Sequence, residues 1–195
     1  MRGVLRGTLV SAVMASSPTQ AQIGRSAGQT SVVFELGAFV PAHTTQKFVE
    51  AGQVNRAFAP HLAWTTGVMR QLTGGQSLGM TGEAGFSTLS YRLAIEPRYR
   101  VSVTRGITAD VAAGALWTHV GDVRESGGAG VTGDVRLNFP GKVGLIARVD
   151  RLRTSDYGTG SAVYGGIVVK DKAAVVTTGV LVLLVAALVP FVPHD

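Results

Sequence analysis

The stretch YRLAIEPRYRVSVT (91–104) decides the fold class of this chain. Its odd-numbered positions carry Tyr, Leu, Ile, Pro, Tyr, Val and Val, whereas its even-numbered positions are charged or hydroxylated, except for one alanine. A period of two indicates a β-strand, because successive side chains of a strand point to opposite faces. Pro97 cannot donate a hydrogen bond to a neighbouring strand, so the sequence also predicts a bulge or bend there.

The same alternation recurs along most of the chain. It appears in the segments 31–40, 62–68, 77–87, 107–118, 131–139, 143–150 and, less regularly, 161–169. Turn-forming residues stand between them at Thr73-Gly74-Gly75, Arg105-Gly106, Pro140-Gly141 and Gly158-Thr159-Gly160, and longer connections at 40–57 and 119–128. Closing a sheet removes its exposed edges. The sequence therefore predicts an all-β, antiparallel, eight-stranded up-and-down barrel over residues 31–170.

One face of the predicted strands carries charges of both signs. These residues are Glu35, Glu83, Arg92, Glu96, Arg98, Arg100, Asp110, Asp134, Arg136, Arg148 and Asp150. Together with the segment VVFELGAFVP (32–41), which looks like a first strand, this pattern resembles small outer-membrane-type barrels of the OmpA/OmpW kind. The resemblance implies that charged pairs fill the lumen and that the apolar face meets lipid.

The same alternation also fits a barrel turned the other way. In that orientation the Val, Leu, Ile and aromatic side chains fill the interior, and the charged face is solvated, with cross-strand ion pairs. We prefer this apolar interior because it is compatible with the segment that follows the barrel.

That segment, AAVVTTGVLVLLVAALVPFV (173–192), has no charged side chain. Twenty helical residues would reach about 30 Å, the thickness of the hydrocarbon core of a bilayer. The sequence predicts a single C-terminal transmembrane helix over 173–192; a buried Val-rich hairpin turning at 177–179 is the alternative. Its small residues are candidates for packing against neighbouring helices, namely Thr177, Thr178, Gly179, Ala186 and Ala187.

The N-terminus resembles a bacterial secretory signal. Arg2 and Arg6 precede a short apolar stretch, and Thr19-Gln20-Ala21 offers small residues where a signal peptidase would cut. We expect a leader over 1–21, cleaved after Ala21, and a polar linker over 22–30; a surface-lying leader is the alternative. Lys170 and Lys172 before the helix would favour a cytoplasmic barrel. We give the leader more weight than these two lysines, and we therefore expect the barrel to be exported.

No motif supports catalysis or cofactor binding. Gly75–Gly79 matches G-x-S-x-G and Gly128–Gly133 matches G-x-G-x-x-G, but strand or turn residues stand where both motifs need a helix. The four histidines show no metal-like spacing, and there is no cysteine. The net charge of +6 comes from scattered residues and not from a basic face with aromatics. We therefore expect no enzyme activity, no catalytic residue, no cofactor, no metal and no nucleic-acid partner.

These expectations lead to one preferred function and two alternatives. The preferred one is a non-catalytic accessory or scaffold subunit of an inner-membrane complex, with its barrel on the periplasmic side. Its partners would be the lipid bilayer and other membrane-protein subunits, for which a respiratory or photosynthetic complex would be a suitable host. The alternatives are an outer-membrane β-barrel, as a structural protein or narrow pore, and a lipocalin-like binder of a small ligand.

Overall fold

The structure, a computed structural model, describes residues 27–46, 58–87, 90–120, 126–154 and 158–178. The predicted leader lies outside them, as does most of the predicted linker. The strands are β1 (Thr30–Gln46), β2 (His61–Gln71), β3 (Gln76–Phe86), β4 (Ser90–Thr104), β5 (Ile107–Val120), β6 (Ser126–Asn138), β7 (Val143–Thr154) and β8 (Gly158–Lys170). Residues 171–178 form a helix after the last strand.

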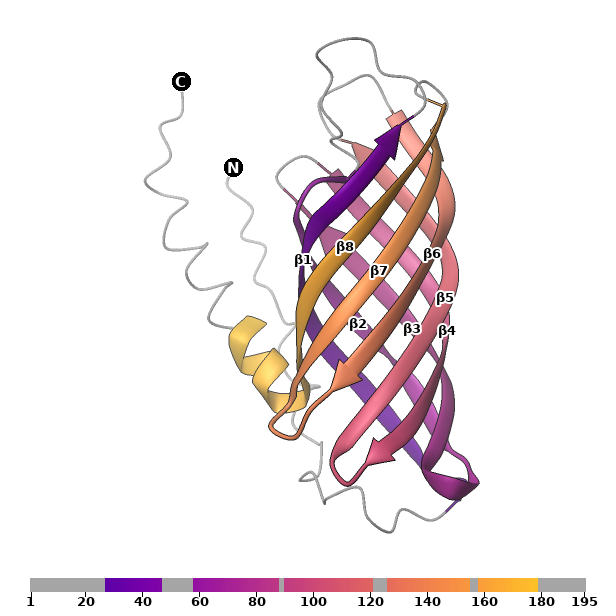
Figure 1. Ribbon diagram of the computed structural model, residues 1–195, viewed down its shortest axis with the longest axis vertical. Helices are drawn as coiled ribbons and strands as arrows, with labels where there is room; N and C mark the ends of the chain where they lie inside the picture. The colour runs from indigo at the N-terminus through magenta and orange to yellow at the C-terminus, as the bar shows by residue number, and fades with distance from the viewer. Residues whose placement is uncertain (1–26, 47–57, 88–89, 121–125, 155–157, 179–195) are drawn as a thin grey trace, which may run out of the picture.

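The strands form a closed antiparallel barrel in the order β1 to β8 (Figure 1). Each strand pairs with its neighbours in sequence, and β1 closes the ring against β8, with Glu35 opposite Lys170. The eight-stranded up-and-down barrel predicted from the alternation is therefore confirmed. Closure pairs both edges of every strand, which is the physical reason a chain of hairpins adopts this form.

Three of the four predicted turns are confirmed. Thr73–Gly75 forms a short 3-10 turn, and β4 turns into β5 through Gly106, whose φ of 88° suits a residue without a side chain. The turn around Pro140-Gly141 joins β6 to β7. The turn predicted at Gly158–Gly160 is wrong, because these residues already pair with β7 as the start of β8.

The bulge predicted at Pro97 is also wrong. Ile95 pairs with Ala115 and Arg98 with Ala112 in one continuous register, and the register shift in this pair lies nearer the end of β4. Pro97 itself is not paired with a residue of β5. Its missing N–H therefore costs a local hydrogen bond without displacing the strand.

The two faces of the wall are chemically opposite, and the interior is the charged one. Large apolar side chains lie exposed on the outside of all eight strands, whereas the charged side chains of the alternating pattern are buried within the ring. The apolar interior preferred from the sequence is therefore wrong. An eight-stranded barrel is just wide enough for side chains to fill it, and here acids and bases meet across that space and neutralise one another.

The chain leaves the barrel at Lys170. Asp171 has a positive φ of 55°, and the helix that follows lies beside β1 at the end where β1 begins (Figure 1). Among the described residues, no helix is both long and apolar enough to cross a bilayer. The rest of the predicted span, 179–192, lies outside the described residues.

Candidate functional site: the charged lumen

The most distinctive site is a set of buried charged side chains inside the barrel, which we call the lumen network. Its members come from every strand except β2: Glu35, Glu83, Arg92, Glu96, Arg98, Arg100, Asp110, Asp134, Arg136, Arg148, Asp150 and Lys170. Each stands at a position whose side chain points inward because of the two-residue period of its strand.

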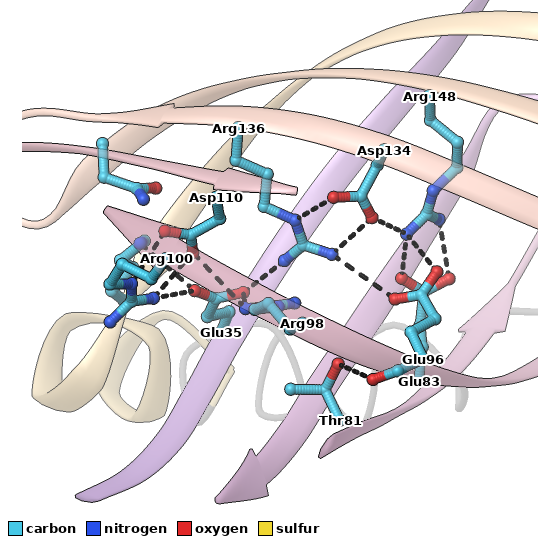
Figure 2. Close-up of polar contacts among 12 residues, drawn as sticks. Glu35, Thr81, Glu83, Glu96, Arg98, Arg100, Asp110, Asp134, Arg136 and Arg148 are labelled. Atoms are coloured by element: carbon cyan, nitrogen blue, oxygen red, sulfur yellow. Dashed lines mark hydrogen bonds and ion pairs between the residues drawn. The ribbon is translucent and has the colours of Figure 1, made fainter. Parts of the chain in front are cut away.

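Glu35 on β1 is the centre of one half of the network (Figure 2). Its Oε2 accepts hydrogen bonds from Arg98 at 2.8 Å and from Arg136, while Lys170 lies 3.2 Å from its Oε1. Arg100 lies farther away, at 3.9 Å. One carboxylate on the first strand therefore connects cations carried by β4, β6 and β8.

Arg148 on β7 is the centre of the other half. It donates two hydrogen bonds to the carboxylate of Glu83, one of them at 2.7 Å, and lies 3.3 Å from Asp134 and 3.9 Å from Glu96. Paired bonds from a guanidinium to one carboxylate fix the orientation of both groups. Arg148 therefore ties β7 to β3, β4 and β6 across the lumen.

Asp134 joins the two halves. Both of its oxygens accept hydrogen bonds from Arg136 at 2.8 Å, and the same carboxylate faces Arg148. Arg100 and Asp110 form a third two-bond pair, at 2.7 Å for both bonds, between directly opposed residues of β4 and β5. The network is thus continuous along the lumen, as the dashed contacts in Figure 2 show.

The lumen network contains as many acids as bases. Six carboxylates face five guanidinium groups and one ammonium group, so its formal charge is zero. Arg98, Arg136 and Arg148 are among the largest fully buried side chains of the described chain. Burying a charge is costly unless it is paired, and here the pairing is reciprocal.

Aromatic rings lie at one end of the network. The rings of Phe39 and His61 stack at 4.8 Å between centroids, and Tyr164 meets His61 edge-on at 5.1 Å. The guanidinium of Arg148 lies 4.3 Å from the centre of the Phe39 ring, and Arg92 lies 5.9 Å from that of Tyr164. Such contacts stabilise a desolvated cation on its apolar side.

The G-x-S-x-G match runs from the turn at Gly75 into β3, and the G-x-G-x-x-G match lies on β6. Ser77 of the G-x-S-x-G match is buried on β3 and donates a hydrogen bond to the side chain of Gln71 at 3.0 Å. The sequence places the glycines of the G-x-G-x-x-G match in a loop and at the start of a strand, whereas the structure places the whole match within β6, so the loop is wrong and the strand is confirmed. Neither motif opens a helix, which both chemistries require.

The histidines do not share a site where they are described. His61 is buried in the lumen, His43 and His119 are exposed, and His194 lies outside the described residues. Within the described ranges there is also no group of three or more His, Asp or Glu side chains placed to hold a metal ion.

Of the five predicted helix-packing residues, Thr177 and Thr178 are described. Thr177 is exposed, whereas Thr178 accepts a hydrogen bond from the indole of Trp64 at 2.9 Å. Gly179, Ala186 and Ala187 lie outside the described residues. Ala174, which is not among the predicted packing residues, is fully buried and stands four residues before Thr178 on the same helix face.

These features define a class: a closed eight-stranded up-and-down β-barrel with an apolar exterior and a charged, ion-paired interior. No protein-family model matches the chain, and no curated protein matches it.

Three solved structures are similar to part of the chain. The N-terminal β-barrel domain of Pseudomonas aeruginosa OprF is 14% identical, with a TM-score of 0.41 over 73% of this chain and 100% of that one. Neisserial surface protein A is 13% identical, with a TM-score of 0.35 over 73% of this chain and 99% of that one. A de novo designed transmembrane β-barrel is 13% identical, with a TM-score of 0.35 over 76% of this chain and 100% of that one. These scores are low, so the topology rests on the strand pairing of the chain itself.

Proposed function

We propose that this chain is an outer-membrane-type β-barrel that crosses a bilayer with its eight strands and acts as a structural protein of the cell envelope. The observation that carries the proposal is the reversed polarity of the wall. Valine, leucine, isoleucine and aromatic side chains are exposed on the outside, and the charges of the lumen network lie inside. A barrel in water would expose the charged face, whereas a barrel in lipid exposes the apolar one.

The four consecutive strands β3 to β6 support this most directly. Every Asp, Glu, Arg and Lys that these strands contain belongs to the lumen network. Their outward positions instead carry apolar and small residues, such as Leu93, Ile95, Val131 and Val135. An outer surface without charge is what hydrocarbon requires of a wall.

The connections support an orientation for the barrel. At the end where β1 begins and β8 finishes, the connections span residues 72–75, 105–106 and 139–142. At the other end they span 47–60, 87–89, 121–125 and 155–157. Membrane barrels of this type carry short periplasmic turns and longer external loops. We therefore propose that the chain termini lie on the periplasmic side.

The preference for an inner-membrane accessory subunit loses its main support. It depended on an apolar interior, which would have left the C-terminal helix as the membrane anchor. The lipocalin-like alternative also fits poorly, since a pocket for an apolar ligand needs an apolar lining. The lumen network instead fills the interior with paired charges, which favours a structural role over an open pore and over an enzyme.

Membrane fractionation and electrophoresis without heating test the proposal together. We expect recovery in the outer-membrane fraction and a folded band that migrates differently from the boiled chain, because a lipid-stable barrel resists dodecyl sulfate until it is heated. Recovery in the inner membrane, or identical mobility with and without heating, would contradict it.

Export through the N-terminal leader belongs to the same proposal. Residues 1–21 would be removed after Ala21 before the barrel assembles. Intact-mass measurement of the protein taken from membranes tests this. A mature chain that begins at Gln22 is expected, and a chain that retains Met1 and is found in the cytoplasm would count against export.

A further inference from the structure

The helix over 171–178 occupies a specific place on the outer wall of the barrel. Trp64, on the outside of β2, donates its indole N–H to the hydroxyl oxygen of Thr178 at 2.9 Å. Leu36, on the outside of the neighbouring strand β1, is only 7% exposed. Val32 and Val40, four residues before and after it on the same face of the strand, are 73% and 62% exposed. The outside of β1 is therefore shielded at Leu36 and exposed farther along the strand in both directions.

The helix presents two different faces. Ala174 and Thr178 are four residues apart, so they lie on one face, and Ala174 is fully buried. Val176 is 65% exposed on the other side. Small residues allow a helix backbone to approach a partner closely, while valines suit contact with lipid. An indole N–H in an apolar environment also needs an acceptor, and the threonine hydroxyl supplies it.

The helix also begins at the seam where the barrel closes. Lys170 ends β8 directly opposite Glu35 of β1, and the two side chains form an ion pair inside the lumen at 3.2 Å. At Asp171 the chain turns to the outside of the wall. The residues of β1 before Glu35 pair with β2 and lie beyond the end of β8.

We propose that the outer wall at Leu36 and Trp64 is a docking site for the chain's own C-terminal helix. The helix enters the same bilayer as the strands and holds together the seam between the first and last strands. Ala174 and Thr178 therefore serve contact within the chain and not contact with another subunit. This inference rests on the proposed function, because it requires the wall to face lipid.

The chain has only two tryptophans, and they form a matched pair of probes. Trp64 lies under the helix, whereas Trp117 lies on the outside of β5 and is 46% exposed. In vesicles of lipids with brominated acyl chains, W117F reports on Trp64 and W64F reports on Trp117. We expect stronger quenching of Trp117 than of Trp64, because bromine atoms reach only an uncovered ring.

Removal of residues 171–195 should then raise the quenching of Trp64 to the level of Trp117 and leave that of Trp117 unchanged. The shift in mobility on heating shows whether the shortened chain is folded. If it does not fold, A174L in the full chain decides, because a larger side chain at this fully buried position would displace the helix. V176L, on the exposed face, is its control and should leave the quenching of Trp64 unchanged.

The outcomes separate this inference from the proposed function. Equal quenching of both tryptophans in the full chain would overturn the docked helix while leaving the membrane barrel in place. Unchanged quenching of Trp64 in the folded shortened chain, or in A174L, would do the same. If lipids with brominated acyl chains fail to quench Trp117, the outer wall does not face lipid, and both proposals fail together.

Discussion

Glu35 shows how strongly a single residue can depend on its partners in this fold. Its carboxylate lies within 4 Å of Arg98, Arg100, Arg136 and Lys170, and its side chain is almost fully buried. If the charge is removed, these cations remain buried with one fewer counter-ion. The cost of breaking a buried ion pair in this way exceeds the value of the pair itself.

We therefore expect E35Q to lower the free energy of unfolding by about 3–5 kcal/mol, the usual penalty for removing one partner of a buried pair. Urea unfolding of the protein in vesicles, followed by tryptophan fluorescence, measures the change. R153Q is the control, since Arg153 is exposed on the outside of β7. Equal stability of E35Q and R153Q would show that the lumen network does not hold the barrel together.

Gly130 is a second residue whose identity is dictated by its surroundings. A Cβ atom built there would lie 1.9 Å from the carbonyl oxygen of Arg151 on the neighbouring strand β7. That oxygen belongs to the backbone and cannot rotate away. A Cβ atom built at Gly165, on β8, would have no atom within 4 Å.

The two glycines make a matched pair of substitutions. G130A should lower the free energy of unfolding by about 1–3 kcal/mol, because the added methyl group must displace a strand. G165A should stay within about 0.5 kcal/mol of the unaltered protein, as expected for a surface change. The same urea titration measures both. A G130A protein as stable as G165A would show that the strands separate at this point at no cost.

At this scale the sequence predicted the members of the site but not their environment. Eleven of the twelve residues in the lumen network belong to the charged face deduced from the alternation. Lys170 was missed because it stands at the end of the least regular strand. A period of two separates two faces but does not say which of them is inside, so the buried contacts between distant strands were beyond its reach.

At the scale of the element, two outward positions of β6 are expected to lie at different depths in a bilayer. Val131 and Leu137 both face outward on this strand, six residues apart, and both are exposed. Leu137 stands one residue before the end of β6, beside the short turn into β7, whereas Val131 stands next to the central residue of the strand. If the wall crosses a bilayer, a charge at these two positions meets different surroundings.

We expect V131K to cost about 2–4 kcal/mol of folding free energy and L137K about 0–1 kcal/mol, the values for a cation at the middle and at the edge of a bilayer. Folding yield and urea stability in vesicles measure both. In detergent micelles, which deform around a charge, the difference should shrink. Equal effects in vesicles would contradict a lipid-facing wall.

The strands also show where a sequence reading of elements fails. The glycines of 158–160 predict a turn, yet they begin β8. Those of 128–133 predict a loop and the start of a strand, yet all of them lie within β6. Glycine usually weakens a strand, but pairing on both edges of a closed barrel supplies hydrogen bonds that local preference does not anticipate. Element order, by contrast, followed from alternation and turn chemistry alone.

At the scale of the whole molecule, the lumen network predicts how the barrel behaves toward ions. Its side chains connect β1, β3, β4, β5, β6, β7 and β8 across the interior. The interior of an eight-stranded barrel is only wide enough for such side chains. We therefore expect the folded protein to insert into planar bilayers without a steady ohmic conductance. A stable open level in most insertions, absent with the boiled protein, would favour the narrow pore instead.

The cancellation of charge inside the barrel also determines where the net charge of the molecule lies. Because six acids offset six bases in the lumen, the formal excess of +6 of the full sequence resides entirely on residues outside that network, and Arg2 and Arg6 of the predicted leader supply two of these charges. Such residues include Arg70, Arg105, Lys142 and Lys172 near the end that carries the short turns. Cation-exchange retention and adhesion to anionic headgroups should therefore respond to substitution of the exposed charges outside the lumen network and not to neutral replacements made in oppositely charged pairs within it.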